Sequence, residues 1–165
     1  MTYLNPVFRY GYDRFFKKCA EIGIDGLICP DLPFEEKGEA EGAAKAHGIS
    51  IISMIAPTSE KRIKSISESA EGFLYIVSSM GVTGVRSEIK TDLSSIMESV
   101  RKYSKIPAAI GFGVSSPEQA EQMSEIADGV IVGSAIVKLV GEYGENAAPK
   151  IFEFVKSMTD VVHNV

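Results

Sequence analysis

Three glycine-containing loops have the residue types and spacing of a site for a phosphate group. They read GVTG (81–84), GFG (111–113) and GS (133–134), and each follows a short apolar run. Glycine lets backbone N–H groups approach an anion closely, and a helix that opens at Ser134 would present an N-terminus that favours negative charge. Each glycine alone could simply make a tight turn, so the succession of three is what favours phosphate. Because no GxxxxGK sequence occurs, nucleotide hydrolysis is not indicated.

Fewer residues offer acid, base or aromatic chemistry. Asp31 directly follows an apolar run in CPDLP, where it could be an acid, a base, an electrostatic helper or a cap of its own loop. Tyr75 and Phe112 lie near expected strand ends, where they could line an apolar pocket or simply pack. His47 ends an expected helix and His163 lies close to the last residue, so the sequence gives histidine catalysis no support.

Such loops have to be positioned by alternating strands and helices, and the apolar pattern shows that alternation. Apolar runs predict strands over 26–29, 49–55, 73–77, 107–110 and 129–132, with 1–4 as the end of another. Helical spacing and capping residues predict helices over 12–22, 35–47, 93–103 and 149–163, and after 59, 116 and 133. Strands that are apolar on both faces and never adjacent in sequence indicate a parallel sheet covered by helices. Both a doubly wound sheet and a (β/α)8 barrel fit, although a barrel usually needs about 250 residues.

The composition excludes several classes of function. The 165 residues are enough for one domain, and the net charge of −5 is scattered, which argues against a nucleic-acid or anionic membrane surface. No apolar stretch is long enough to span a membrane. Cys19 and Cys29 lack the spacing of a metal site and suit small core residues in a reducing setting. These features fit a cytoplasmic protein.

Six motifs together resemble those of one enzyme family. They read NPVFRYG, DGLICPDLP, APTS, YIVSSMGVTG, IGFGVSSPEQ and DGVIVGSAIVK, in the order and at the spacing seen in tryptophan synthase alpha subunits. The resemblance runs through essentially all 165 residues and implies an α/β fold of TIM-barrel type. The barrel would be a single partial domain over 1–165 with about five full parallel strands. The resemblance also implies a lyase of tryptophan biosynthesis that cleaves indole-3-glycerol phosphate to indole and glyceraldehyde 3-phosphate.

Partners and site residues are implied by the same resemblance. The alpha subunit passes indole to a beta subunit in an alpha-beta-beta-alpha complex, and pyridoxal phosphate belongs to the beta subunit, so we expect neither cofactor nor metal in this chain. The expected phosphate ligands are Gly84, Gly113, Gly133 and Ser134. The expected substrate-pocket residues are Tyr3, Tyr75, Thr83 and Phe112. Asn5 and Pro33, both in expected loops, would contact the beta subunit, and Asp31 matches an auxiliary aspartate.

The chain departs from the family at its start. It begins at what looks like the end of the third barrel strand, so strands one and two are not in it, nor are the Glu and Asp of the family's acid–base pair. Retro-aldol cleavage needs two positioned carboxyl groups, so we expect the phosphate half of the site without the proton-transfer half. Two alternatives stay open. One is another phosphate-binding barrel enzyme of histidine or tryptophan biosynthesis, and the other is a non-catalytic fragment that binds phosphate or docks to the beta subunit.

Overall fold

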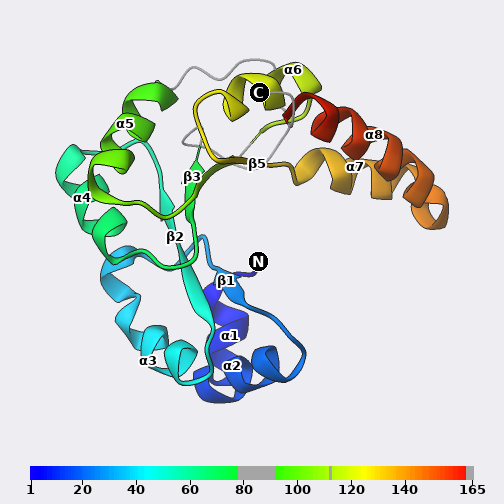
Figure 1. Cartoon of the computed structure of the whole chain (residues 1–165). Helices are drawn as coiled ribbons and strands as arrows, with labels where there is room; N and C mark the ends of the chain where they lie inside the picture. The colour runs from blue at the N-terminus through cyan, green and yellow to red at the C-terminus, as the bar shows by residue number, and fades with distance from the viewer. Residues whose placement is uncertain (78–91, 112, 163–165) are drawn as a thin grey trace.

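Five parallel strands form one curved sheet, and their spatial order β1-β2-β3-β4-β5 is also their order along the chain. The structure is a computed structural model that describes residues 1–77, 92–111 and 113–162. The strands are β1 (Gly26–Ile28), β2 (Ser50–Ile55), β3 (Leu74–Val77), β4 (Ala108–Gly111) and β5 (Gly129–Ile131). Every pairing between neighbours is parallel, as the apolar runs predict. Figure 1 shows the sheet as the inner wall of an arc.

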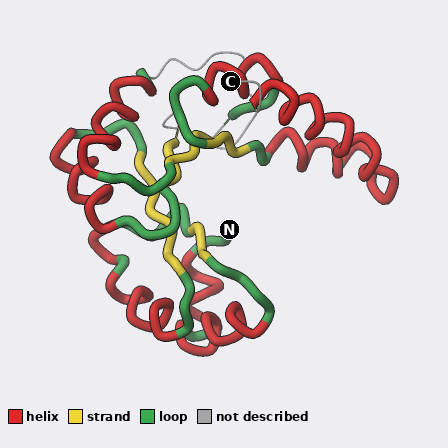
Figure 2. Tube along the Cα trace, in the orientation of Figure 1, coloured by secondary structure: helices red, strands yellow, loops and turns green. Residues whose placement is uncertain are grey.

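Helices cover the convex side of this arc, and the strands lie on its inner side (Figure 2). They are α1 (Leu4–Tyr10), α2 (Tyr12–Glu21), α3 (Gly38–Ala46), α4 (Glu60–Ser69), α5 (Leu93–Tyr103), α6 (Pro117–Ser124), α7 (Ser134–Tyr143) and α8 (Ala147–Val162), with short 3-10 turns η1 (Phe34–Glu36) and η2 (Gly144–Asn146). A doubly wound sheet has helices on both faces and a point where the strand order reverses. Here the order never reverses, so the chain forms successive units of a barrel and the doubly wound alternative is wrong.

Two apolar clusters lie between the sheet and the helices. The larger contains the outward side chains of β3 and β4, among them Leu74, Ile76 and Ile110, and joins them to α4, α5, α6 and α8. The smaller contains Val7 and Leu27 and joins β1 to α1, α2 and α3. Both clusters keep water away from the outer face of the sheet. Packing therefore fixes where each strand ends and where the loop after it begins.

The inner face of the sheet carries the alternate side chains of the same strands. Ile52, Tyr75 and Val77 are buried there, and Met54 and Ile131 are partly buried beside them. This division follows from the side-chain period of two along a strand. The inner face is therefore apolar along most of its length.

Two helix starts that the sequence singles out are capped by side chains. The Asp92 carboxylate accepts the Ser95 N–H (3.1 Å) at α5, and the Ser116 hydroxyl accepts the Gln119 N–H (3.3 Å) at α6. The Gln119 side-chain oxygen accepts the Ser115 N–H (2.9 Å). In a capping box it would accept the N–H of the N-cap residue itself, so here the bond is shifted by one residue. These local bonds fix where the two helices begin.

The expected strand over residues 1–4 is wrong. The Thr2 N–H does donate to the Ile28 carbonyl (3.1 Å), as the amide of a neighbouring strand would. Tyr3, however, is already the N-cap residue of α1, with φ −77° and ψ 160°, and the helix begins at Leu4. The helix begins two residues after this bond, so the segment is too short to form a series of strand hydrogen bonds.

The expected helix over 35–47 is divided into two pieces. Residues 34–36 form η1, and α3 begins only at Gly38. His47 ends α3 and Gly48 has φ +72°, as the His-Gly ending predicts.

The two cysteines lie in the core, as the sequence indicates. Cys19 and Cys29 are each 5% exposed, and both are free thiols. Among the described residues, no group of three or more His, Cys, Asp or Glu side chains is placed to hold a metal ion. None of the helices in the described ranges has both the length and the apolar character that a bilayer crossing requires.

We expect Leu74→Ala to lower the free energy of unfolding by about 2–5 kcal/mol, because it leaves a cavity in the larger cluster. Leu74 has no exposed surface. Val137→Ala is the control: Val137 is 69% exposed on α7, so its truncation should change stability by less than about 0.5 kcal/mol. Urea denaturation followed by circular dichroism measures both, and equal losses in the two variants would contradict this account of the core.

Candidate functional site

The expected phosphate loops after β4 and β5 lie next to one another at the carboxyl edge of the sheet. Gly111 at the end of β4 pairs with Ile131 at the end of β5, and Gly113 and Gly133 each follow two residues later. The structure therefore brings Gly113, Gly133 and Ser134 to one corner of the edge. Three other expected site residues lie outside the described residues, namely Thr83, Gly84 and Phe112.

Gly111, the first glycine of GFG, is required by packing. A Cβ at this position would lie 2.6 Å from Cζ and 2.9 Å from Cε1 of Tyr75, which is far inside van der Waals contact. The Tyr75 ring thus crosses over β4 on the inner face of the sheet. Tyr75 is 5% exposed, and burial raises the pKa of its phenol, so the group stays protonated at neutral pH.

Gly113 and Gly133 differ in why a glycine is there. Gly113 has φ +91°, a conformation that residues with a side chain rarely adopt, so its backbone alone explains the glycine. Gly133 has φ −120°, and a Cβ built on it would meet no atom within 4 Å. Neither backbone strain nor crowding by the described part of the chain demands a glycine at 133. A group from outside the chain could therefore approach this backbone without meeting a described atom.

The backbone at the start of α7 has amides to offer to such a group. The N–H groups of Ile136 and Val137 bond to the Gly133 carbonyl (2.9 and 3.1 Å). Within the described ranges, the amides of Ser134 and Ala135 have no hydrogen-bond acceptor. The first N–H groups of a helix have no partner inside it and favour an anion. Gly133 and Ser134 are both exposed, so this end of α7 is accessible.

A second group of expected residues lies at the carboxyl end of β1, the outermost strand on the side of the sheet opposite to β5. Tyr3 is 64% exposed, and the bond from the Thr2 N–H to the Ile28 carbonyl holds it beside β1. Asn5 and Pro33 are also exposed. Pro33 precedes η1 in a loop, as expected, but Asn5 lies in the first turn of α1, so its expected loop is wrong. The sequence signal for α1 is weak because the helix has only seven residues.

Asp31 caps a helix with its side chain. Its Oδ1 accepts the Leu4 N–H at 2.8 Å and the Cys29 S–H at 3.4 Å. Asp31 therefore caps α1, whose first residue lies 27 positions earlier in the chain. It does not cap its own loop, which was the other expectation. Burial raises the pKa of the Cys29 thiol to about 12, and the hydrogen bond to Asp31 adds to that shift. The thiol is therefore a donor to Asp31 at neutral pH.

Carboxylates at the amino edge of the sheet serve stability. The Asp128 Oδ2 accepts the Ala108 N–H (2.9 Å) and so joins the starts of β4 and β5. His47 at the end of α3 contacts Asp13 of α2 (Nε2 to Oδ1, 2.8 Å). At this edge the polar side chains of Asp128, His47 and Asp13 thus join elements of the scaffold to one another.

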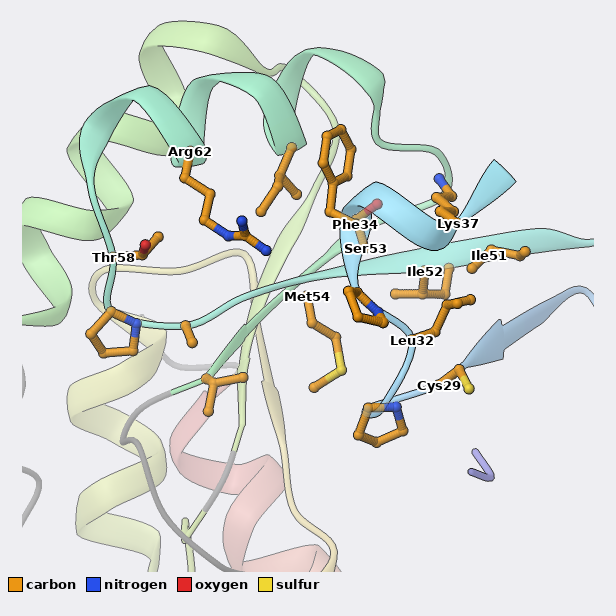
Figure 3. Close-up of a pocket in the computed structure, with 16 residues that line it drawn as sticks. Cys29, Leu32, Phe34, Lys37, Ile51, Ile52, Ser53, Met54, Thr58 and Arg62 are labelled. Atoms are coloured by element: carbon orange, nitrogen blue, oxygen red, sulfur yellow. The ribbon is translucent and has the colours of Figure 1, made fainter. Parts of the chain in front are cut away.

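Sequence reasoning missed a cavity of about 370 Å³ between the loops that follow β1 and β2 (Figure 3). Its lining is mostly apolar, with Lys37, Ser53, Thr58 and Arg62 as exceptions. Arg62 pairs with Glu35 (Nη2 to Oε2, 3.1 Å), which links α4 to η1. Only 9% of the Lys37 side chain is exposed, and its ammonium lies 3.5 Å from the Glu41 carboxylate. A lysine inside a run of charged residues gives no sign in the sequence that it is buried.

The comparisons with known proteins agree on one family. A family model for the tryptophan synthase alpha chain matches residues 1–163. The tryptophan synthase alpha chain of Lacticaseibacillus casei is 49% identical over 158 residues, which cover 96% of this chain and 59% of that protein. The alpha chain of Bacillus licheniformis is 50% identical over 153 residues, covering 92% of this chain and 57% of that protein. The chain thus spans less than two thirds of the length of these relatives.

Solved structures show the same likeness. A chain from the tryptophan synthase a2b2 complex of Pyrococcus furiosus superposes with a TM-score of 0.85 at 34% identity, over 98% of this chain and 66% of that one. A chain of Mycobacterium tuberculosis tryptophan synthase gives 0.86 at 37% identity, over 98% and 61%. This chain belongs to the tryptophan synthase alpha chain family. The predicted fold, an incomplete (β/α)8 barrel with five parallel strands, is confirmed.

We expect Gly111→Ala to lower the free energy of unfolding by about 1–3 kcal/mol, because the new methyl group forces the Tyr75 ring from its place. Gly129→Ala in the neighbouring strand is the matched control. There a Cβ would meet only the Ala109 Cβ, at an ordinary 3.5 Å. Chemical denaturation of both variants measures the difference. If Gly111→Ala is as stable as Gly129→Ala, the close packing of Tyr75 on β4 is not real.

Proposed function

We propose that this chain works as part of a tryptophan synthase alpha chain, a cytoplasmic lyase of tryptophan biosynthesis. The substrate would be indole-3-glycerol phosphate, cleaved to indole and glyceraldehyde 3-phosphate. Family membership supports the reaction, and the observation that carries the site is the exposed start of α7, where the Ser134 and Ala135 amides have no acceptor among the described residues. Residues 1–165 would act as one barrel-type domain.

The phosphate would be bound by backbone amides rather than by cationic side chains. We assign it to Gly84, Gly113, Gly133 and Ser134, whose loops follow the last three strands of the sheet. A helix N-terminus with free amides attracts a dianion without any lysine or arginine. The substrate would extend from there along the inner face, in contact with Tyr3, Tyr75, Thr83 and Phe112.

Proton transfer would depend on groups other than those on the inner face of the described strands. The buried and partly buried inner side chains include Ile52, Met54, Val77 and Ile131, and none of these titrates. Tyr75 is held protonated by burial, and Asp31 is engaged by Leu4 and Cys29. The cleavage needs two positioned carboxyl groups. We assign them to the Glu and Asp that the family carries in strands ahead of the matched portion.

The beta subunit of tryptophan synthase is the partner that we propose. The related Pyrococcus furiosus structure is described as an a2b2 complex with mutual activation, so that family member works with a beta subunit. Asn5 and Pro33 are exposed at the same end of the sheet, which suits a contact with such a partner. Pyridoxal phosphate would belong to the beta subunit, and the alpha chain would need no cofactor of its own.

The phosphate site is tested by Gly133→Val. The new side chain would occupy the open space beside Gly133, so we expect affinity for indole-3-propanol phosphate to fall by about tenfold or more, a change of about 1.4 kcal/mol. Gly141→Val is the control, because a Cβ at that α7 position also meets nothing within 4 Å. Titration followed by phosphorus NMR measures both. Equal affinity in the two variants would show that the phosphate group does not bind beside Gly133.

The assignment of proton transfer is tested by turnover. A polypeptide of these 165 residues should bind the analogue yet release no indole from indole-3-glycerol phosphate, since the inner face of its described strands offers no acid–base pair. Indole release is measured by absorbance or by coupling to a beta subunit. Sustained release by the purified polypeptide would show that another pair of groups moves the protons. Absence of both binding and release would argue for the docking alternative.

A further inference from the structure

Asp31 joins two segments that are far apart in sequence. We infer that Asp31 is a positioning residue, which holds the first turn of α1 and the loop after β1 together so that Asn5 and Pro33 form one preorganised surface. This inference rests on the proposed function, in which Asn5 and Pro33 meet the beta subunit. Asp31 itself need not touch substrate or partner.

The start of α1 takes its cap from this carboxylate. Tyr3 stands at the N-cap position, and its side chain makes no capping bond. The Leu4 N–H, which has no acceptor inside the helix, donates instead to the Asp31 Oδ1 at 2.8 Å. The carboxylate also brings negative charge to the positive end of the helix. The Thr2 N–H adds a second bond to the same region, at the Ile28 carbonyl.

The loop after β1 is held so that Asp31 points toward α1. The Leu32 N–H bonds to the Cys29 carbonyl (3.2 Å), which closes a tight turn around Asp31. Cys29, Pro30, Leu32 and Pro33 line the cavity of Figure 3, and Asp31 is not among its lining residues. The Cys29 S–H donates to the same Oδ1, which fixes the carboxylate from the side of the loop. Asp31 is thus held from both sides.

Both proposed contact residues sit within two positions of this link. Asn5 directly follows Leu4, and Pro33 comes two residues after Asp31. Both are exposed and so accessible to a partner. A surface that is already ordered loses less conformational entropy when a partner binds. Removal of the link should therefore weaken binding although neither contact residue has changed.

The experiment compares Asp31→Ala, which removes the acceptor, with Asp31→Asn, which keeps a side-chain oxygen for the Leu4 N–H. In Asp31→Ala we expect hydrogen exchange at the Leu4 amide to rise by about three- to thirtyfold, the range for loss of a helix cap. Affinity for a tryptophan synthase beta subunit, measured by surface plasmon resonance, should fall several-fold. Asp31→Asn should restore both. Asp25→Ala is the control, since it removes an exposed aspartate at the amino end of β1.

The outcomes separate this inference from the proposed function. Unchanged Leu4 exchange in Asp31→Ala would overturn the cap. Faster exchange with an unchanged beta-subunit affinity would overturn the positioning role, and so would failure of Asp31→Asn to restore binding. If the unaltered chain does not bind a beta subunit, the proposed partner is wrong. The exchange rate of the Leu4 amide would still show whether Asp31 caps α1. A circular dichroism melt checks that each variant is folded.

Discussion

Parallel pairing of the strands is the constraint on which every candidate residue depends. Because neighbouring strands run in the same direction, all their carboxyl ends meet at one edge of the sheet, and each loop that follows a strand begins there. The pairing of Gly111 with Ile131 is what sets the loops of Gly113 and Gly133 side by side. The apolar clusters beneath the helices hold that pairing in place. A site at this edge therefore needs no contact between the loops themselves.

Glycines at this edge have three separate physical causes. The one at 111 makes room for the Tyr75 ring, the one at 113 has a positive φ, and the one at 133 faces open space. A count of glycines in the sequence treats the three as equal support for an anion site. The geometry shows that only Gly133 among them lacks a cause within the described chain. Among these glycines, the one at the start of α7 therefore gives the phosphate proposal its main structural support.

The sequence predicts what depends on local pattern and misses what depends on distant contacts. Strands with a continuous apolar run and helices with caps such as Asp92 and Ser116 lie close to where the pattern puts them. The bond from Asp31 to Leu4 spans 27 positions and leaves no periodic trace, so the sequence leaves the role of Asp31 open. The burial of Lys37 depends on how α3 packs beside β2, which no single stretch reveals. The family's motifs identify functional residues but not the contacts that hold them.

The two groups of candidate residues lie beside the two outermost strands, β5 and β1, which suits separate roles in substrate binding and partner contact. The proposed phosphate residues Gly133 and Ser134 lie beside β5, whereas Tyr3, Asn5 and Pro33 lie near β1. Between them the inner face presents apolar side chains such as Ile52 and Val77, which suit the aromatic part of a substrate better than its charged end. A substrate with a phosphate at one end and an indole at the other matches that order. Under the proposed function, the hydrogen bond between Asp31 and Leu4 would hold the end of the sheet that faces the beta subunit, so order there would favour binding of that partner.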